Sequence, residues 1–417
     1  MNNYDTVIMG GGLSGLTCGI ALAQRGQRVA VVAAGPSTLQ CSGGSLELLG
    51  SVDGQPVIHP LDVAASLPED HPYRKLGVER LSGLAAAAKQ VLADAGIVTH
   101  GDSSTNHWRL TPMGVACPAW LTLDDFATLA TEDDLRGKRV TLLSIKGYLD
   151  QPTLMTASGL RRLGAQTEVR EITTAELTAL RRSPAALRAT GIAKRLVSHT
   201  ALSHLADEIN RLDPGADMTL LPAVLGLNDA DAIQELQSML QQPVSLLATL
   251  PPSVPGMRMS MQLCHYFQML GGTYLQGDAA VGGTFDGKHL AGVRTRNLKD
   301  DALCARSFVL ATGSFMSHGL VADSERVREP VLGLDVDYSG SCGQWSRYGI
   351  FNEQPYMRFG VAVDAALHPS RSGAAIPNVW AIGSVLSGHN PLLTGDASGV
   401  SLLTAMAAAA AIASGTE

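Results

Sequence analysis

The chain has 417 residues, of which 45% are hydrophobic and 17% charged, so it is long and apolar enough for two or three structural units around a sizeable core. Its formal net charge of -7 argues against a nucleic-acid-binding protein and against a basic membrane-surface patch. The six cysteines are scattered and none belongs to a C-x-x-C pair, so we expect no zinc or iron–sulfur ligand set and no bound metal.

The N-terminal stretch predicts a strand, a glycine-rich loop and a helix. Thr6 to Met9 is a short apolar run of β-forming residues, followed directly by Gly10-x-Gly12-x-x-Gly15 and an apolar helical segment over 13–23. The glycines permit a tight turn and a close approach of the backbone to a phosphate, which the N–H groups of the helix start also favour. The alternative is a glycine turn that binds nothing. The residues expected to bind a nucleotide here are Gly10, Gly11, Gly12, Leu13, Ser14 and Gly15.

The second strand, over 29–33, lacks a residue that such sites normally have. An acid that binds the ribose usually follows the glycine loop by about 20 residues. Here that place is taken by Ala33, Ala34 and Gly35. We therefore expect FMN, which has no second ribose, with FAD as the alternative if its ribose is held weakly or by a distant side chain.

The loop CSGGSLELLG (41–50) follows the second strand and is dense in small hydroxyl and glycine residues. We expect it to contact the flavin phosphate or ring edge, although an ordinary solvent loop would have a similar composition. The contacting residues would be Ser42, Gly43, Gly44 and Ser45.

The middle of the chain differs from the N-terminal part in its pattern of predicted helices and short strands. A helix is predicted over 81–95, short strands within 107–123 and 139–150, and helices near 200–212 and 230–240. Pro251-Pro252 marks the return to the first unit. The fold class is therefore α/β, a Rossmann-like FAD/NAD(P)-binding flavoprotein fold formed by residues 1–96 and 251–417, with an inserted α+β substrate or cap domain over 97–250.

The C-terminal third supplies a second glycine-rich segment. A hairpin turn is expected at 286–289, and strands at 307–315 and 378–385. Ser398 is a candidate N-cap for a helix whose start would face a flavin ring and stabilise negative charge on it. The alternative is a buried alanine-rich helix that only completes the fold; its apolar stretch over 400–413 is too short to span a bilayer. The residues expected to contact the cofactor are Ala311, Thr312, Gly313, Gly383, Ser384, Ser398, Gly399 and Val400.

Signals for catalytic residues are sparse. Arg347 and Arg358 are candidates to hold a phosphate or carboxylate, and His389 is a candidate to take a hydroxyl proton during hydride transfer. Each of the three is more readily explained as a structural residue.

Together these segments resemble the B subunit of the bacterial anaerobic glycerol-3-phosphate dehydrogenases, from end to end. The resemblance rests on YDTVIMGGGLSGLTCGIAL, CSGGSLELLGSVDGQPV, SFVLATGSF and NVWAIGSVLSGHNPLLTGDASGVS. The second of these is much more particular to that family than the first. One departure from the wider FAD-dependent pattern is Gly383-Ser384, where an acid is common.

The resemblance implies quinone-linked oxidation of glycerol 3-phosphate to dihydroxyacetone phosphate in anaerobic respiration. Its implied partners are an FAD-binding catalytic A subunit and a membrane-associated iron–sulfur C subunit, with FMN in the B subunit. The implied location is cytoplasmic, at the inner membrane only through the complex. Two rival hypotheses are a free-standing FAD-dependent dehydrogenase and a flavoprotein-fold scaffold without chemistry.

Overall fold

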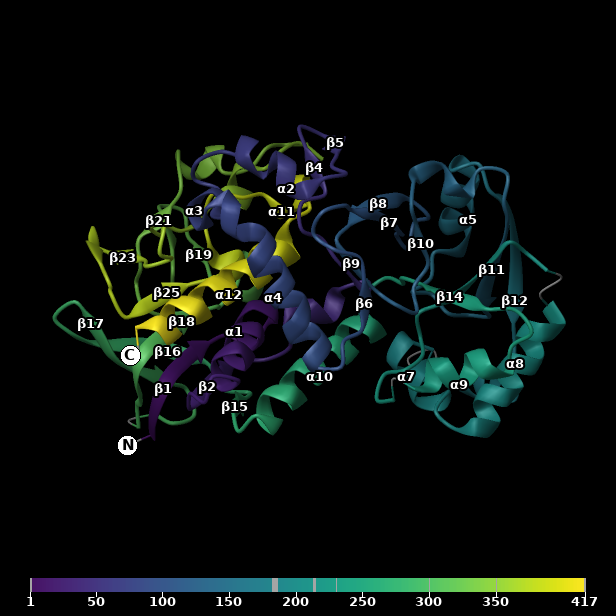
Figure 1. Cartoon of the computed structure of the whole chain (residues 1–417), viewed down its shortest axis with the longest axis horizontal. Helices are drawn as coiled ribbons and strands as arrows, with labels where there is room; N and C mark the ends of the chain where they lie inside the picture. The colour runs from purple at the N-terminus through teal and green to yellow at the C-terminus, as the bar shows by residue number, and fades with distance from the viewer. Residues whose placement is uncertain are drawn as a thin grey trace.

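The computed structural model describes residues 2–181, 187–212, 215–229, 231–299, 301–349 and 351–415. Figure 1 shows a larger body that contains both chain ends and a smaller body built from the middle of the chain. The larger body is formed around a seven-stranded sheet in the order β15-β2-β1-β18-β17-β16, with β25 also pairing with β18. Its strands are β1 (Asn2–Met9), β2 (Val29–Ala33), β15 (Thr273–Gln276), β16 (Ala280–Asp286), β17 (His289–Thr295), β18 (Leu303–Leu310) and β25 (Val379–Ala381).

The N-terminal and C-terminal strands meet in the middle of this sheet. β1 pairs in parallel with β2 on one side and with β18 on the other, and β25 extends the parallel part beyond β18. All five residues of β2 are buried, as expected for a strand covered on both faces. β16 and β17 form the predicted antiparallel hairpin. The predicted α/β architecture is therefore confirmed.

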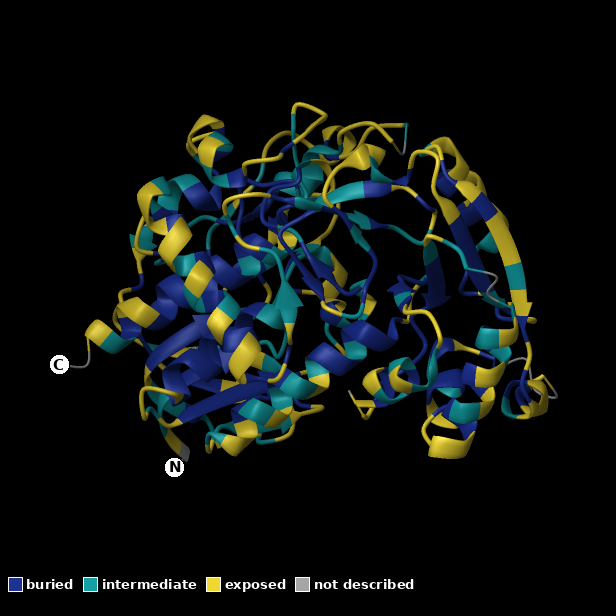
Figure 2. Ribbon diagram, turned by 45° about the vertical axis from the view of Figure 1, so that its right-hand side comes forward, coloured by how far each residue is buried: buried dark blue, intermediate teal, exposed yellow. Residues whose placement is uncertain are grey.

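Three helices pack around α1 in the core of the larger body. α1 (Leu13–Ala23) contacts α4 (Leu81–Asp94), α10 (Val254–Met269) and α12 (Ala397–Ser414). Figure 2 shows the strands and inner helices of this body in the buried colour. By length and composition α12 passes as a membrane-crossing helix, and it is longer than the apolar stretch that the sequence indicated. In the structure it is mostly buried between α1 and α4, which identifies it as a core helix.

The smaller body contains two sheets. One is antiparallel, in the order β10-β7-β8, and the other is parallel, in the order β12-β11-β13-β14. The sequence did not predict the parallel sheet. The strands are β7 (His107–Leu110), β8 (Ala116–Ala119), β10 (Thr128–Leu129), β11 (Arg139–Ile145), β12 (Gln166–Ile172), β13 (Met218–Pro222) and β14 (Val244–Leu247). The helices are α5 (Thr153–Arg162), α6 (Ala175–Leu180), α7 (Ala189–Arg195), α8 (His199–Leu212) and α9 (Asp231–Met239).

The two bodies are joined through the loop after β2. In a small sheet, β9 (Leu121–Leu123) pairs with both β3 (Ser45–Leu46) and β6 (Thr99–His100). Ser253, where the chain returns, donates its N–H to the Gln40 carbonyl at 3.1 Å and its hydroxyl to the Ser42 carbonyl. The buried side chain of Arg258 on α10 reaches Asp125 at 2.9 Å. The remaining short elements are α2 (Pro60–Val63), α3 (Pro72–Leu76), α11 (Pro391–Thr394), β4 (Ser51–Val52), β5 (Gln55–Pro56), β19 (Val321–Ala322), β20 (Val327–Arg328), β21 (Val336–Asp337), β22 (Gly360–Val361), β23 (Ser370–Arg371) and β24 (Ala374–Ala375).

Candidate flavin site and the buried histidine cluster

The glycine loop has the backbone geometry that the sequence predicted. Gly10 has a φ of +122°, and a Cβ there would lie 2.1 Å from the Ala311 carbonyl oxygen. A Cβ on Gly15 would lie 1.9 Å from the Gly10 carbonyl oxygen. Neither position accepts a side chain, because β18 and α1 press against the loop. The structure thus brings Gly10 and Gly15 together with the predicted Ala311.

The second predicted segment reaches the same loop from the other end of the chain. Gly383, which has a φ of +75°, follows β25, and a Cβ there would lie 2.4 Å from Ser14 Oγ. Its N–H donates to Thr404 Oγ1 of α12 at 2.9 Å. The two glycine-rich segments therefore converge, as Figure 1 shows for α1 and the yellow α12.

The loop also has free polar groups and space. A Cβ on Gly12 would meet only Ser37 Cβ, at an ordinary 3.7 Å. The hydroxyl oxygens of Ser37 and Thr312 are buried and have no hydrogen-bond partner among the described residues. Unsatisfied buried hydroxyls beside a glycine loop suit a ligand rich in acceptors, such as a flavin phosphate. The residues present fit a flavin nucleotide.

Several other predicted contacts are directed elsewhere. A Cβ on Gly44 would lie 2.7 Å from the Phe126 ring, and Ser45 Oγ accepts from Thr122 Oγ1 at 2.9 Å. Both residues therefore face the smaller body rather than the glycine loop. Gly43 approaches Ala248 of that body in the same way.

The start of α12 differs from the prediction in two respects. Its N-cap residue is Asp396 rather than Ser398, and the Asp396 side chain does not cap the helix. The N–H of Gly399 donates to the Glu47 carbonyl at 2.8 Å, and the N–H of Val400 bonds to the Asp396 carbonyl. These two amides are used within the protein, so Gly399 and Val400 do not offer them to a ring. The competing contact comes from the loop after β3, which the sequence gave no reason to place there.

Asp396 is instead the centre of a cluster of buried ionisable groups. Its Oδ2 lies 2.8 Å from His71 Nε2, and its Oδ1 lies 3.2 Å from His389 Nδ1. All three side chains are buried, Asp396 completely. Burial alone would raise the pKa of Asp396, but the two histidines more than offset it and hold the pKa well below its usual range.

Hydrogen bonds fix the proton positions in this cluster. The Tyr73 N–H donates to His71 Nδ1 at 3.1 Å, so the His71 proton is on Nε2 and points to Asp396. The contact with Asp396 likewise places a proton on His389 Nδ1. No described residue forms a hydrogen bond with His389 Nε2. Sequence reasoning found His389 and missed its two partners; the only signal was the acid in TGDASG, just before the predicted helix.

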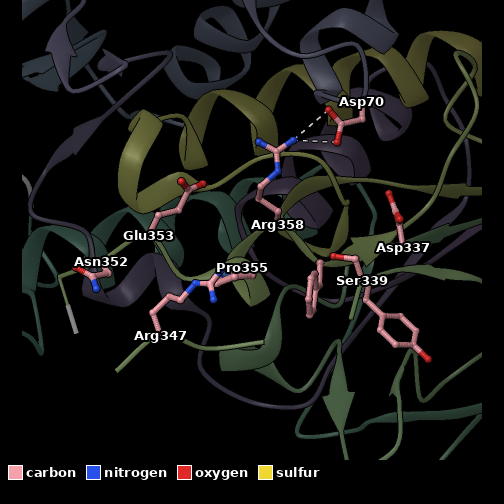
Figure 3. Close-up of a pocket in the computed structure, with 10 residues that line it drawn as sticks. Asp70, Asp337, Ser339, Arg347, Asn352, Glu353, Pro355 and Arg358 are labelled. Carbon is pink, nitrogen blue, oxygen red and sulfur yellow. Dashed lines mark hydrogen bonds and ion pairs between the residues drawn. The ribbon is translucent and has the colours of Figure 1, made fainter. Parts of the chain in front are cut away.

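The two predicted arginines share a separate pocket of about 510 Å³. Figure 3 shows that Arg358 faces Asp70, to which it donates at 2.9 and 3.1 Å, while Arg347 comes from a different segment and is exposed. Asp337 and Glu353 also line the pocket, so it contains three carboxylates for two guanidinium groups. His389 does not line it. The Arg358 carbonyl accepts from the Gly388 N–H at 3.0 Å, which links the pocket to the histidine cluster through backbone.

Comparison with known proteins indicates the family of the chain. The chain matches the model of the FAD binding domain over residues 5–400. It is 40% identical over 407 residues to the B subunit of anaerobic glycerol-3-phosphate dehydrogenase from Pectobacterium atrosepticum, covering 97% of both chains. It is 34% identical over 427 residues to the Haemophilus influenzae protein of the same name, covering 98% of both.

A solved structure of Escherichia coli quinol fumarate reductase FrdA aligns with 99% of this chain and 70% of its own, at 10% identity and a TM-score of 0.42, too distant to carry an argument. The fold, the glycine site and the family match define a flavoprotein of the oxidoreductase class, with a flavin as its cofactor. Within that class, the chain belongs to the family of anaerobic glycerol-3-phosphate dehydrogenase B subunits. The family resemblance seen in the sequence is confirmed.

Proposed function

We propose that this chain is the flavin-binding subunit of a quinone-linked anaerobic glycerol-3-phosphate dehydrogenase. The complex would oxidise glycerol 3-phosphate to dihydroxyacetone phosphate and pass electrons through an FAD-binding A subunit and a membrane-associated iron–sulfur C subunit. The observation that carries the proposal is the convergence of Gly10–Gly15 with Gly383 around unpaired hydroxyls, in a chain whose relatives bear that name. The chain would lie in the cytoplasm, at the inner membrane only through its partners.

FAD is the cofactor that we propose. The matching family model is that of an FAD binding domain, and the comparisons give no support to FMN as first choice. Gly10, Gly12, Ser14, Thr312 and Gly383 would hold the phosphates and the neighbouring part of the flavin. A bound flavin supplies the two-electron acceptor for the oxidation of an alcohol.

The chain's own residues would then bind substrate and move one proton. Arg347 and Arg358 are proposed to hold the substrate phosphate, because guanidinium groups bind phosphate oxygens in pairs. His389 Nε2 is proposed to accept the proton of the C2 hydroxyl. Asp396 would keep that histidine in the required tautomer and stabilise its protonated form, and His71 would hold Asp396 in place.

The test is cofactor extraction combined with steady-state kinetics. The chain, purified alone and with its A subunit partner, should release an equimolar amount of FAD on acid denaturation. In the complex, Arg347→Gln with Arg358→Gln should raise KM for glycerol 3-phosphate about 10-fold or more, because each charged hydrogen bond contributes ~1.5–3 kcal/mol. Arg162→Gln, an exposed arginine of α5, is the matched control. A protein that stays colourless after reconstitution with FAD and FMN would contradict the proposal, and an unchanged KM would remove the arginines from it.

A second candidate is a subunit that binds flavin or orients its partners without touching substrate. Two observations favour it: Arg358 is already paired with Asp70 in a pocket with an excess of carboxylates, and His389 is only 3% exposed. Full activity of a complex that contains Gly12→Val and lacks flavin in this chain would support a scaffold. Loss of activity together with this flavin would support the redox role.

A further inference from the structure

A pocket of about 450 Å³ lies at the amino ends of the strands of the parallel sheet in the smaller body. β11 begins at Arg139, and β12, its parallel neighbour, begins at Gln166; both residues line the pocket. Figure 1 shows the two strands on the side of the smaller body that faces away from the larger one. The pocket is therefore separate from the glycine loop and from the pocket that contains Arg347 and Arg358.

This pocket carries more positive than negative charge. Arg139 comes from the start of β11, and Arg161 comes from the last turn of α5. Among the described lining residues the only carboxylate is that of Glu168, which is already paired with Arg170 at 2.8 Å. In a chain with a net charge of -7, two guanidinium groups around one pocket indicate an anionic ligand.

Both guanidinium groups are held in place by backbone and still have donors for a ligand. Arg161 Nη2 donates to the Thr167 carbonyl oxygen at 2.9 Å. Arg139 Nη2 donates to the Gly215 carbonyl oxygen at 2.6 Å. Arg139 Nε lies 3.8 Å from Asp217 Oδ2, which is too far for a hydrogen bond. A guanidinium group has more N–H donors than these contacts use, so the remaining donors can bind an anion.

A buried hydroxyl lines the same pocket. Thr167 is 9% exposed, and its Oγ1 has no hydrogen-bond partner among the described residues. A buried hydroxyl without a partner costs free energy unless a bound molecule supplies the missing hydrogen bond. Because the Thr167 carbonyl oxygen holds Arg161, the hydroxyl and that guanidinium group lie in the same part of the pocket. Together they can donate to the oxygens of one anion.

We propose that this pocket binds a phosphate monoester, a small phosphorylated molecule whose phosphate group is held by Arg139, Arg161 and Thr167. Guanidinium groups bind phosphate oxygens in pairs, and the threonine hydroxyl supplies a further donor. A pocket of about 450 Å³ is larger than a phosphate group and leaves room for the organic part of the ester. This site is additional to the proposed function and does not depend on it.

The test uses inorganic phosphate as the probe, and its binding is measured by isothermal titration calorimetry at constant ionic strength. The protein carries Arg347→Gln and Arg358→Gln, so that the pocket in the larger body does not contribute. In this background Arg161→Gln should raise the Kd for phosphate about 10-fold or more, because a charged hydrogen bond is lost. Arg162→Gln is the matched control and should leave the Kd unchanged, since Arg162 is the next residue of α5, is exposed and does not line the pocket.

Thr167→Val tests the hydroxyl separately from the charge. Valine keeps the β-branched shape and removes one donor, so the Kd for phosphate should rise about 5-fold. Because the hydroxyl has no partner among the described residues, the Tm measured without phosphate should not fall. This second measurement distinguishes the loss of a ligand contact from a folding defect.

Two results of the titration would overturn the inference. One is equal Kd values in Arg161→Gln and Arg162→Gln, and the other is the absence of phosphate binding in the Arg347→Gln, Arg358→Gln background. Cosedimentation with vesicles of phosphatidylcholine and phosphatidic acid is measured in parallel. Vesicle binding that Arg161→Gln abolishes, without binding of free phosphate, would identify a lipid headgroup and overturn the assignment to a small molecule. Flavin extraction tests the proposed function independently of all these results.

Discussion

Each of the two bodies contains a sheet whose first strand lies in the interior between two parallel neighbours, and the bodies differ in the loop that follows that strand. After β1 come three glycines with open backbone at Gly12, beside the Ser37 and Thr312 hydroxyls, with which no described residue forms a hydrogen bond. After β11 come side chains that fold back: Gln151 Nε2 donates to the Leu143 carbonyl at 2.9 Å, and Asp150 pairs with Arg188 at 3.0 Å. Parallel topology places a crevice at the carboxyl ends of the strands, but local residues decide whether it remains open.

The largest expected effect concerns Asp396, the buried carboxylate in the larger body, whose glycine loop leaves the carboxyl end of β1 open. Asp396→Asn removes the carboxylate between two buried histidines, and we expect the free energy of unfolding to fall by about 3 kcal/mol. Chemical denaturation monitored by circular dichroism measures this. Asp217→Asn, an exposed acid at the opposite edge of the second sheet, should change stability by less than about 0.5 kcal/mol. Equal losses of stability in the two variants would show that Asp396 contributes no more to the folded state than an exposed acid does.

Gly12→Val tests whether a flavin binds at the exposed backbone of the glycine loop after β1. The Cβ of the new side chain meets no closer protein atom than Ser37 Cβ at 3.7 Å, so we expect folding to be retained. It would project into the phosphate position, and we expect flavin affinity to fall by ~100-fold, or about 2.7 kcal/mol. Flavin titration and thermal denaturation should be measured on the same preparation. Wild-type affinity in this variant would mean that flavin does not approach Gly12.

A pH effect is expected from the antiparallel sheet beside the parallel one in the smaller body. Burial of His107 on β7, with some repulsion from His100, lowers its pKa from 6.5 to about 4. Between pH 6.5 and 4 the unfolded chain therefore binds a proton at His107 that the folded chain does not bind. The free energy of unfolding has its full value above pH 6.5 and decreases as the pH falls towards 4.

The matching variant is His107→Asn, which should flatten this decline. The ring is only partly buried, so we expect a difference of ~1–2 kcal/mol between the two pH limits. Urea denaturation at about pH 7 and about pH 4.5 measures it. His289→Asn, on an exposed strand end, serves as the control and should leave the wild-type slope.

The smallest expected effect comes from the loop after β11 in the smaller body, where side chains cover the carboxyl end of the strand. Gly147 follows β11 and has a φ of +84°, with only Leu187 near the position of a Cβ. Gly147→Ala should cost about 1 kcal/mol of stability through backbone strain alone. It should leave flavin affinity unchanged, as judged by titration. A loss of flavin affinity would contradict the view that only the loop after β1, and not the loop after β11, binds the flavin.

Local patterns in the sequence determined the elements that form the glycine-loop region of the larger body. The strand, glycine loop and helix at 6–23, the hairpin at 286–289 and the strand before Ala311 were all predictable, because each depends on neighbours in the chain. The need for glycine at position 15 follows from the same local turn, because a Cβ there would meet the Gly10 carbonyl oxygen. These elements were sufficient to indicate a flavoprotein fold and the family.

Contacts between distant residues decided the rest. His71 and Asp396 are 325 residues apart in sequence, and only the packing of α3 against α12 brings them together. α12 begins at Ala397, so Ser398 lies inside the helix and the predicted N-cap was wrong. Asp396 has the N-cap position, but its side chain bonds to the two histidines instead of capping the helix. The preference for FMN rested on the missing acid at the end of β2, and the matching model of an FAD binding domain gives it no support. A sequence reveals which residues can turn, bury or bind locally, but the partner of a buried polar group is chosen by the tertiary structure, because burial leaves that group no water to bond instead.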